Sequence, residues 1–388
     1  MTLAGAQPAT ATRRASSVEI AQFTGEVVYL YAFDVAYELV RRPVPQLLGQ
    51  AVAQFVVDAS KRSPRQLFFY RPQMVRLPPL ERLGPQGPLR LERTIKLLPI
   101  GAISIMVRVP FTVRQIEDLV AFHDLQFTNG TWLYDEVREL AHEVQRELKP
   151  YLVRPVDTLG DEEAYTVFCI RGPLRSADGS VCAAEEWLLD NRRRVAGLLA
   201  EERDASKLSE QEAIESTNKY LSYYDRDLVV VDWDAALVID EPRYFDETLY
   251  LMELANVQLA ELEAYDRMLD DAVERSYRDV LRRPPGRGRM KVQRSLRELR
   301  IDLARLSDEL SNITKFFGDW HLARIYQALS SRFHLADWHH TIDQKLKTLD
   351  DLYQLLGMEQ NNRWMLVLEV SIVLLFVIDL VLLALGRK

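Results

Sequence analysis

The carboxy-terminal segment constrains this chain more than any other part of its sequence. Residues 364–385 read WMLVLEVSIVLLFVIDLVLLAL, and Gly386, Arg387 and Lys388 follow them. As a helix, about 22 residues reach roughly 33 Å, which is enough to cross a hydrocarbon core of roughly 30 Å. The sequence therefore predicts one membrane-spanning helix within residues 363–388, preceded by a large water-exposed body.

Two acidic residues, Glu369 and Asp379, interrupt this apolar segment. An ionised group at bilayer depth costs on the order of 2.5 kcal/mol or more, so such groups are usually paired, close to water or functional. Ten residues of helix turn through about 1000°, which leaves the two side chains about 80° apart on adjoining faces. Contact between helices of an assembly is the favoured role, and ion conduction or no role are the alternatives.

Composition limits the class of protein and its compartment. The chain has 388 residues, 48% of them hydrophobic, and a formal net charge of −8, which argues against a nucleic-acid binder as a whole. Two cysteines without metal-type spacing, Cys169 and Cys182, favour a reducing compartment. No secretory signal is visible. Residues 1–24 are predicted to be a disordered tail, with a targeting segment as the alternative.

Residues 25–241 are predicted to form an α/β sandwich domain. Runs rich in β-branched and aromatic residues predict strands over 27–33, 66–70, 102–109 and 165–170, and a late hairpin over 228–232 and 236–239. Helices are predicted after Thr112, where Thr112 and Gln115 form a capping-box pattern, and over 132–148 and 184–199. The order of the strands cannot be derived from these patterns.

Residues 242–362 are predicted to form a helical stalk. After a helix over 243–280 and a Pro-Pro-Gly break, apolar residues recur at alternating steps of four and three: Val292, Leu296, Leu299, Leu303, Leu306, Leu310, Ile313 and Phe317. This seam is typical of coiled-coil packing. We expect an antiparallel hairpin with the 243–280 helix, or alternatively self-association. A third helical stretch, over 322–356, leads to the membrane segment.

The break between the first two stalk helices is strongly basic. Its positive residues include Arg282, Arg283, Arg287, Arg289, Lys291 and Arg294. Such a basic linker would fit phosphates of ribosomal RNA or anionic lipid headgroups, although no aromatic residues interleave to stack on bases. The alternative is a solvated hinge between two helices.

The sequence shows no enzyme motif. It contains no phosphate-cradling loop, no His-Glu-x-x-His and no Gly-x-Ser-x-Gly. His339 and Asp343 have a spacing that metal ligands use on one helix face, but no third ligand is evident. We therefore predict no catalytic residues, no cofactor, no metal site and no small-molecule substrate.

The C-terminal third resembles the "required for meiotic nuclear division" family. One feature is the block over 315–320, KFFGDW, with Leu322 and Tyr326 after it, and another is the pair Glu369 and Asp379 in the apolar segment. The sequence departs from the family at 339–340, where His-His stands in place of its Leu-Asn-Arg pattern. The resemblance covers residues 225–385.

This resemblance implies a self-associating protein with one C-terminal span, in a bacterial inner membrane or, as the alternative, the mitochondrial inner membrane. The body would face the cytoplasm or matrix, and eukaryotic members support translation there. We therefore expect a membrane-anchored structural or tethering protein that presents its soluble domain to a partner such as the ribosome. The alternative is a divergent magnesium-channel-like transporter that lacks the usual second span.

Overall fold

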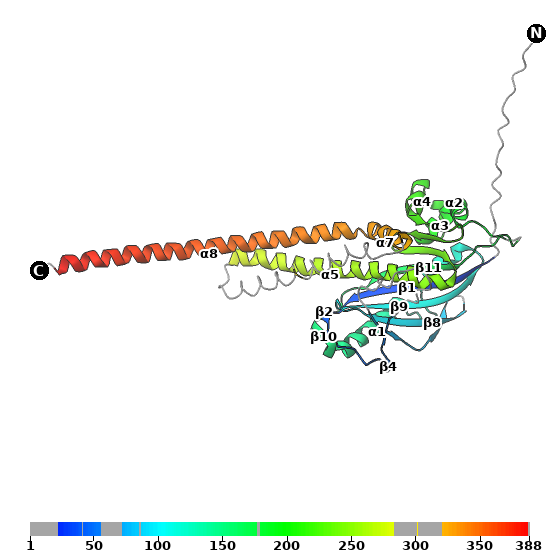
Figure 1. Cartoon of the computed structure of the whole chain (residues 1–388), viewed down its shortest axis with the longest axis horizontal. Helices are drawn as coiled ribbons and strands as arrows, with labels where there is room; N and C mark the ends of the chain where they lie inside the picture. The colour runs from blue at the N-terminus through cyan, green and yellow to red at the C-terminus, as the bar shows by residue number, and fades with distance from the viewer. Residues whose placement is uncertain are drawn as a thin grey trace, which may run out of the picture.

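The computed structural model describes residues 22–40, 42–55, 72–84, 87–176, 179–282, 301 and 320–386. Figure 1 shows a body of strands and helices at one end and one long helix, α8, that carries the C-terminus away from it. A large sheet occupies the first part of the chain, and long helices follow it. This confirms the predicted mixed α and β class with the sheet before the helices.

Ten strands form the central sheet. Their order is β12 (Tyr220–Leu221), β13 (Leu228–Val231), β14 (Ala235–Asp240), β11 (Glu163–Arg171), β1 (Phe23–Asp34), β9 (Ala102–Val113), β8 (Gly87–Leu97), β6 (Gln73–Arg76) and β5 (Ala53–Gln54), with β7 (Leu80–Gly84) also paired to β8. β11 and β14 pair in parallel and the other neighbours pair antiparallel. Two short ladders lie outside this sheet: β2 (Ala36–Leu39) with β10 (Leu152–Pro155), and β3 (Gln46–Leu47) with β4 (Gln50–Ala51).

Both faces of the sheet are buried, because side chains alternate between two apolar clusters along each strand. In β1, Val27 and Tyr29 belong to one cluster, and Val28 and Leu30 belong to the other. The first face is covered by η1 (Ile116–Phe122), α1 (Leu133–Leu148), α2 (Ala184–Asp190) and α3 (Arg192–Leu199). The second face is covered by α5 (Phe245–Arg282), α7 (Trp320–Arg332) and the first part of α8 (Leu335–Leu385).

The structure confirms most of the predicted elements of the body and corrects two. The predicted strands over 27–33, 102–109 and 165–170 lie in β1, β9 and β11, the late hairpin is β13 and β14, and the helix over 132–148 is α1. The predicted strand over 66–70 lies outside the described residues. α4 (Glu210–Thr217) lies in the segment between β11 and β13.

The first correction concerns the start of the helix after β9. Thr112 is not its cap: it lies in β9, opposite Thr24 of β1, and the capping residue is Gln115. Thr112 pairs in the strand instead of capping the helix, because a β-branched residue such as threonine favours a β-sheet.

The second correction concerns the predicted helix over 184–199, which is split into α2 and α3 at Asn191. The side-chain nitrogen of Asn191 donates to the carbonyl oxygen of Trp187 at 3.0 Å. An asparagine side chain that bonds to backbone in this way competes with the helical pattern.

Most of the second stalk helix and of the basic linker is outside the described residues. This applies to the predicted seam of Val292, Leu296, Leu299, Leu303, Leu306, Leu310, Ile313 and Phe317, and to Arg283, Arg287, Arg289, Lys291 and Arg294. Arg282 is the last residue of α5. The coiled-coil hairpin therefore stays a prediction, and in the described part α5 packs against α7 and α8.

Candidate functional site

The outer part of α8 presents a long apolar surface. The segment Met365–Leu383 is the one stretch, within the described part of the chain, whose helix is long and apolar enough to cross a membrane. None of it is buried against the body, and Phe376 is 70% exposed. An exposed apolar surface of this size is typical of contact with a membrane or with another protein. The predicted apolar helix is therefore confirmed as a helix with an uncovered surface.

Glu369 and Asp379 both lie in this uncovered segment. Ser371 lies there too, and its hydroxyl donates to the carbonyl oxygen of Val367 at 2.7 Å. The serine is thus satisfied within its own helix, while the body of the chain covers neither carboxyl group.

The inner part of α8 is held against α5. Ile342, Leu346 and Leu349 are buried in the same apolar cluster as Leu269 of α5. Beside them, the ammonium group of Lys345 lies 2.7 Å from an oxygen of Asp266 and 2.6 Å from an oxygen of Asp270. The two helices lie side by side and run away from the sheet together (Figure 1). This contact joins the apolar segment to the body through packed helix rather than through a loop.

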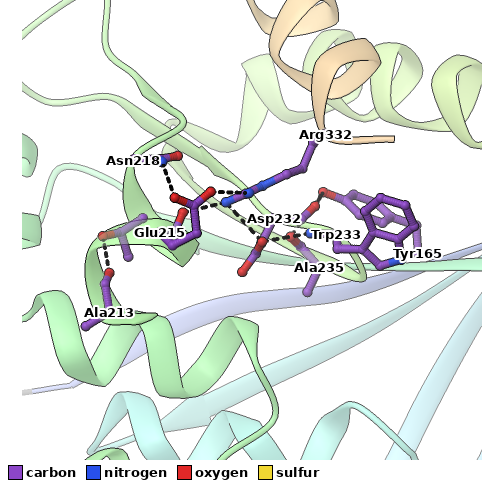
Figure 2. A network of polar contacts seen from close by, with 9 residues as sticks. Tyr165, Ala213, Glu215, Asn218, Asp232, Trp233, Ala235 and Arg332 are labelled. Atoms are coloured by element: carbon purple, nitrogen blue, oxygen red, sulfur yellow. Dashed lines mark hydrogen bonds and ion pairs between the residues drawn. The ribbon is translucent and has the colours of Figure 1, made fainter. Parts of the chain in front are cut away.

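A sharp corner separates α7 from α8, and Arg332 fastens it to the sheet. The chain turns at Phe333 and His334, and His334 has a left-handed backbone with φ of +50°. Figure 2 shows the Arg332 side chain reaching from the corner between Glu215 and Asp232. Its guanidinium donates to the Glu215 side chain at 3.1 Å and to the Glu215 carbonyl at 2.5 Å, and it lies 3.2 Å from Asp232.

Tyr165 of β11 completes this corner. Its hydroxyl donates to the carbonyl oxygens of Asp232 and Ala235, each at 3.0 Å, and its ring packs edge-on against Phe333 at 5.0 Å. Burial raises the pKa of Asp232, and the neighbouring guanidinium of Arg332 opposes that rise. The β13–β14 turn, the end of α4 and the α7–α8 corner are thus tied together. Arg332 and Asp232 are largely removed from water, whereas the Glu215 side chain is 59% exposed.

We expect Arg332→Gln to lower the free energy of unfolding by about 2–3 kcal/mol, because Asp232 would lose the cation that offsets its burial. Arg278→Gln is the matched control, since Arg278 is an exposed residue of α5 that lies 3.8 Å from Glu274. An exposed pair of this kind contributes at most about 1 kcal/mol. Thermal unfolding of the full chain in detergent measures both variants, and equal losses would contradict the role of Arg332.

Acidic side chains gather where α5 crosses one end of the sheet. Asp34 ends β1, Glu163 begins β11, and Glu263 and Arg267 lie on α5. Burial raises the pKa of Glu163 to about 8, with Glu263 and Asp234 adding to the rise and Arg267 opposing it. Burial also raises the pKa of Asp34 to about 6. Desolvation therefore favours the protonated form of both carboxyl groups in the folded chain.

This cluster predicts that the body loses stability as pH rises. A carboxyl group whose pKa increases on folding binds more protons in the folded state, so its stabilising effect is complete below the unfolded pKa and disappears as pH passes the folded pKa. For Glu163 that window runs from its ordinary value of 4.5 to about 8. We expect the free energy of unfolding to fall by about 2–5 kcal/mol across it.

Glu163→Gln should flatten this pH dependence and make the chain more stable than the unmodified protein at pH 8, because the amide carries no charge. Glu92→Gln is the control, since the Glu92 side chain is 60% exposed. Denaturant unfolding between pH 5 and pH 8.5 measures the effect. A Glu163→Gln variant with the original slope would show that this carboxyl is not the source.

A second cluster of buried polar side chains lies under α5, and no sequence pattern predicts it. Lys96 of β8 forms an ion pair with Glu253 of α5, and the Ser104 hydroxyl donates to the other oxygen of Glu253 at 2.6 Å. The Lys96 ammonium also lies 3.9 Å from the centre of the Phe55 ring and 5.4 Å from that of Tyr250. Lys96 and Glu253 are each 4% exposed. The pair is enclosed between the sheet and α5, and it joins the two.

The described residues contain no group of three or more histidine, cysteine or acidic side chains that could hold a metal ion. His339 and Asp343 lie one turn apart on α8, as their spacing predicts. Burial lowers the pKa of His339 and the carboxylate of Asp343 opposes this. The structure thus places the two residues on one helix, one turn apart.

The body of the chain matches a known protein family. Residues 24–246 match the family model described as "Uncharacterized protein MJ0711, N-terminal domain". Uncharacterized protein MJ0711 of Methanocaldococcus jannaschii is 23% identical over 220 residues, which is 57% of this chain and 65% of that relative. The chain therefore spans less than two thirds of the length of that protein. No solved structure matches the chain.

The family match runs from β1 to the first residues of α5. The matched region therefore comprises the sheet and the helices that cover its first face. The resemblance to the "required for meiotic nuclear division" family rests on residues 225–385, most of which lie beyond this match, and it stays a prediction. Since the matched residues make up more than half of the sequence, the chain belongs to the family of the MJ0711 N-terminal domain.

Proposed function

We propose that this chain is a membrane-anchored structural protein that holds its sheet domain at a set distance from a bilayer. The observation that carries this proposal is the continuity of α8. It begins at Leu335, packed on the body, and runs as one helix of 51 residues to Leu385. The same helix therefore serves as part of the core of the body and as the apolar span.

The length of α8 sets the distance between body and membrane. Leu335 and Met365 are separated by 30 residues, and a rise of 1.5 Å per residue places them about 45 Å apart. The packing of α5 along the inner part of α8 stiffens this spacer, since Lys345 of α8 forms ion pairs with Asp266 and Asp270 of α5. A stiff helical spacer suits a tether, because it fixes where a partner meets the presented domain.

We also propose a location and a partner for this protein. The body would face the cytoplasm on a bacterial inner membrane, or the matrix on a mitochondrial one, and would present its surface to a macromolecular partner such as the translation machinery. The basic linker that follows Arg282 would add contacts to phosphate groups of anionic lipid or RNA, which its run of positive charge favours. The heptad seam over 292–317 would pair the stalk helices or join copies of the chain.

Alkaline extraction of vesicles that carry the full chain tests the anchor. A span across the hydrocarbon core resists carbonate, whereas a protein bound by charge is released. We expect the chain in the pellet, and its recovery in the supernatant would contradict the proposal.

A further inference from the structure

The spacing of the two acids in the apolar segment points to one side of the helix. Glu369 and Asp379 are ten residues apart, which is one heptad plus three residues and so the step from position a to position d. Supercoiling to about 3.5 residues per turn narrows the angle between them to about 50°. With Glu369 at position a, the seam of a and d residues is Met365, Glu369, Ile372, Phe376, Asp379 and Leu383.

The remaining positions of the segment are suited to lipid. From Leu366 to Leu385, every residue outside this acidic seam is apolar except Ser371. The Ser371 hydroxyl is already bonded to the Val367 carbonyl. The two remaining polar groups are the carboxyl groups of Glu369 and Asp379, and both lie on the acidic seam. Exposure of these groups to hydrocarbon would cost free energy, so they need partners outside their own helix.

The body of the same chain faces the other side of α8. Ile342 is buried against α5. Glu369 follows it by 27 residues, which is about 2700° or a half-turn away on the helix. Asp379 follows Ile342 by 37 residues, which is about 3700° or about 100° away, and the seam as a whole is centred about 140° from Ile342. The acidic seam thus lies mostly on the side of α8 that α5 does not occupy, and a second helix can approach it there.

We propose that the acidic seam packs against the same seam of a second copy, with the two helices parallel in the membrane; this rests on the proposed membrane anchor. Copies inserted in the same direction place Glu369 opposite Glu369 and Asp379 opposite Asp379 at equal depth. Two adjacent carboxyl groups can share one proton, which removes a charge and forms a hydrogen bond between the helices. A single polar position in a seam also sets the register of a helix pair.

Cysteine crosslinking in vesicles tests this arrangement on the full chain. Ile372→Cys places a thiol on the acidic seam, and Leu374→Cys places one two residues later, at nearly the same depth but on the far side. Both are made with Cys182→Ser, while Cys169 remains because it is fully buried. After mild oxidation we expect a disulfide-linked dimer of the chain from Ile372→Cys and little from Leu374→Cys.

Replacing both acids shows whether they carry the contact. Glu369→Leu with Asp379→Leu should lower the crosslinked fraction at position 372 by about 3- to 30-fold, the effect of losing one or two hydrogen bonds between membrane helices. Glu369→Gln with Asp379→Asn should retain the dimer, because amides can still pair across the seam.

Carbonate extraction of the same vesicles separates this inference from the anchor on which it rests. Two results for a chain that stays in the pellet would overturn the second-copy proposal and leave the anchor standing. One is equal crosslinking at positions 372 and 374, and the other is crosslinking at position 372 only to a different protein. A crosslinked fraction that the Leu variants do not change also overturns it. A chain found in the supernatant overturns the anchor itself.

Discussion

A chain that ends at Arg363 is expected to move from the membrane pellet to the supernatant on carbonate extraction, while the full chain stays in the pellet. The truncation removes the whole segment Met365–Leu383, which is the part of α8 long and apolar enough to span a bilayer. Since none of that segment is buried against the body, its loss should leave thermal unfolding of the body within about 0.5 kcal/mol of the original.

A double substitution provides a control that keeps the length of the chain. Val373→Arg with Val377→Arg places two cations on lipid-facing positions, each at a cost of about 2.5–3.5 kcal/mol at the centre of a membrane helix. Both changes leave the acidic seam intact, and we expect them to release much of the protein. Retention of the truncated chain in the pellet would show instead that the body binds membranes without the span.

Lys96→Met is expected to lower the free energy of unfolding of the detergent-solubilised chain by about 3–5 kcal/mol. The substitution removes the cation and leaves Glu253 buried with a charge that its surroundings cannot satisfy, apart from the Ser104 hydroxyl. Burying an unpaired charge is among the largest penalties that one substitution can cause. Chemical denaturation followed by circular dichroism measures the loss.

A cycle of variants separates the cost of an orphaned charge from the value of the pair. Lys96→Met, Glu253→Leu and Ser104→Ala together replace the polar group by apolar atoms, and we expect this triple variant to be more stable than Lys96→Met alone. Lys345→Met is the matched control at a partly exposed ion pair and should cost about 1 kcal/mol or less. Equal stability of the single and triple variants would show that the pair does not behave as a buried ion pair.

Local sequence patterns predict the buried central strands and the long apolar helix, because burial dictates the residue types of these elements. β1, β9 and β11 are central strands with both faces buried, so their sequences are continuous runs of β-branched and aromatic residues. The apolar segment of α8 is equally local, since its length and composition suffice to identify it. The start of η1 and the break at Asn191 were predicted wrongly because cross-strand pairing and a side-chain bond to the backbone decided them.

The sequence predicts the polar residues of the apolar segment but not the polar contacts buried in the body. Glu369 and Asp379 stand out because acids are rare in an apolar run of that length. Lys96 and Glu253 do not stand out, since they are 157 residues apart and each sits in a pattern that would equally suit a surface residue. Arg332 and Asp232 are similarly separated along the chain and meet only after the α7–α8 corner packs on the β13–β14 turn.

The amino-acid sequence by itself determined the long apolar segment, the spacing of its two acids and the class of fold, because each depends on residues close together in the chain. Only the tertiary structure decided that this segment continues a helix packed in the core, that α5 lies beside the inner part of that helix, and that buried pairs join the sheet to α5. Those features depend on which distant segments share one side of the sheet, and side-chain periodicity carries no information about that pairing.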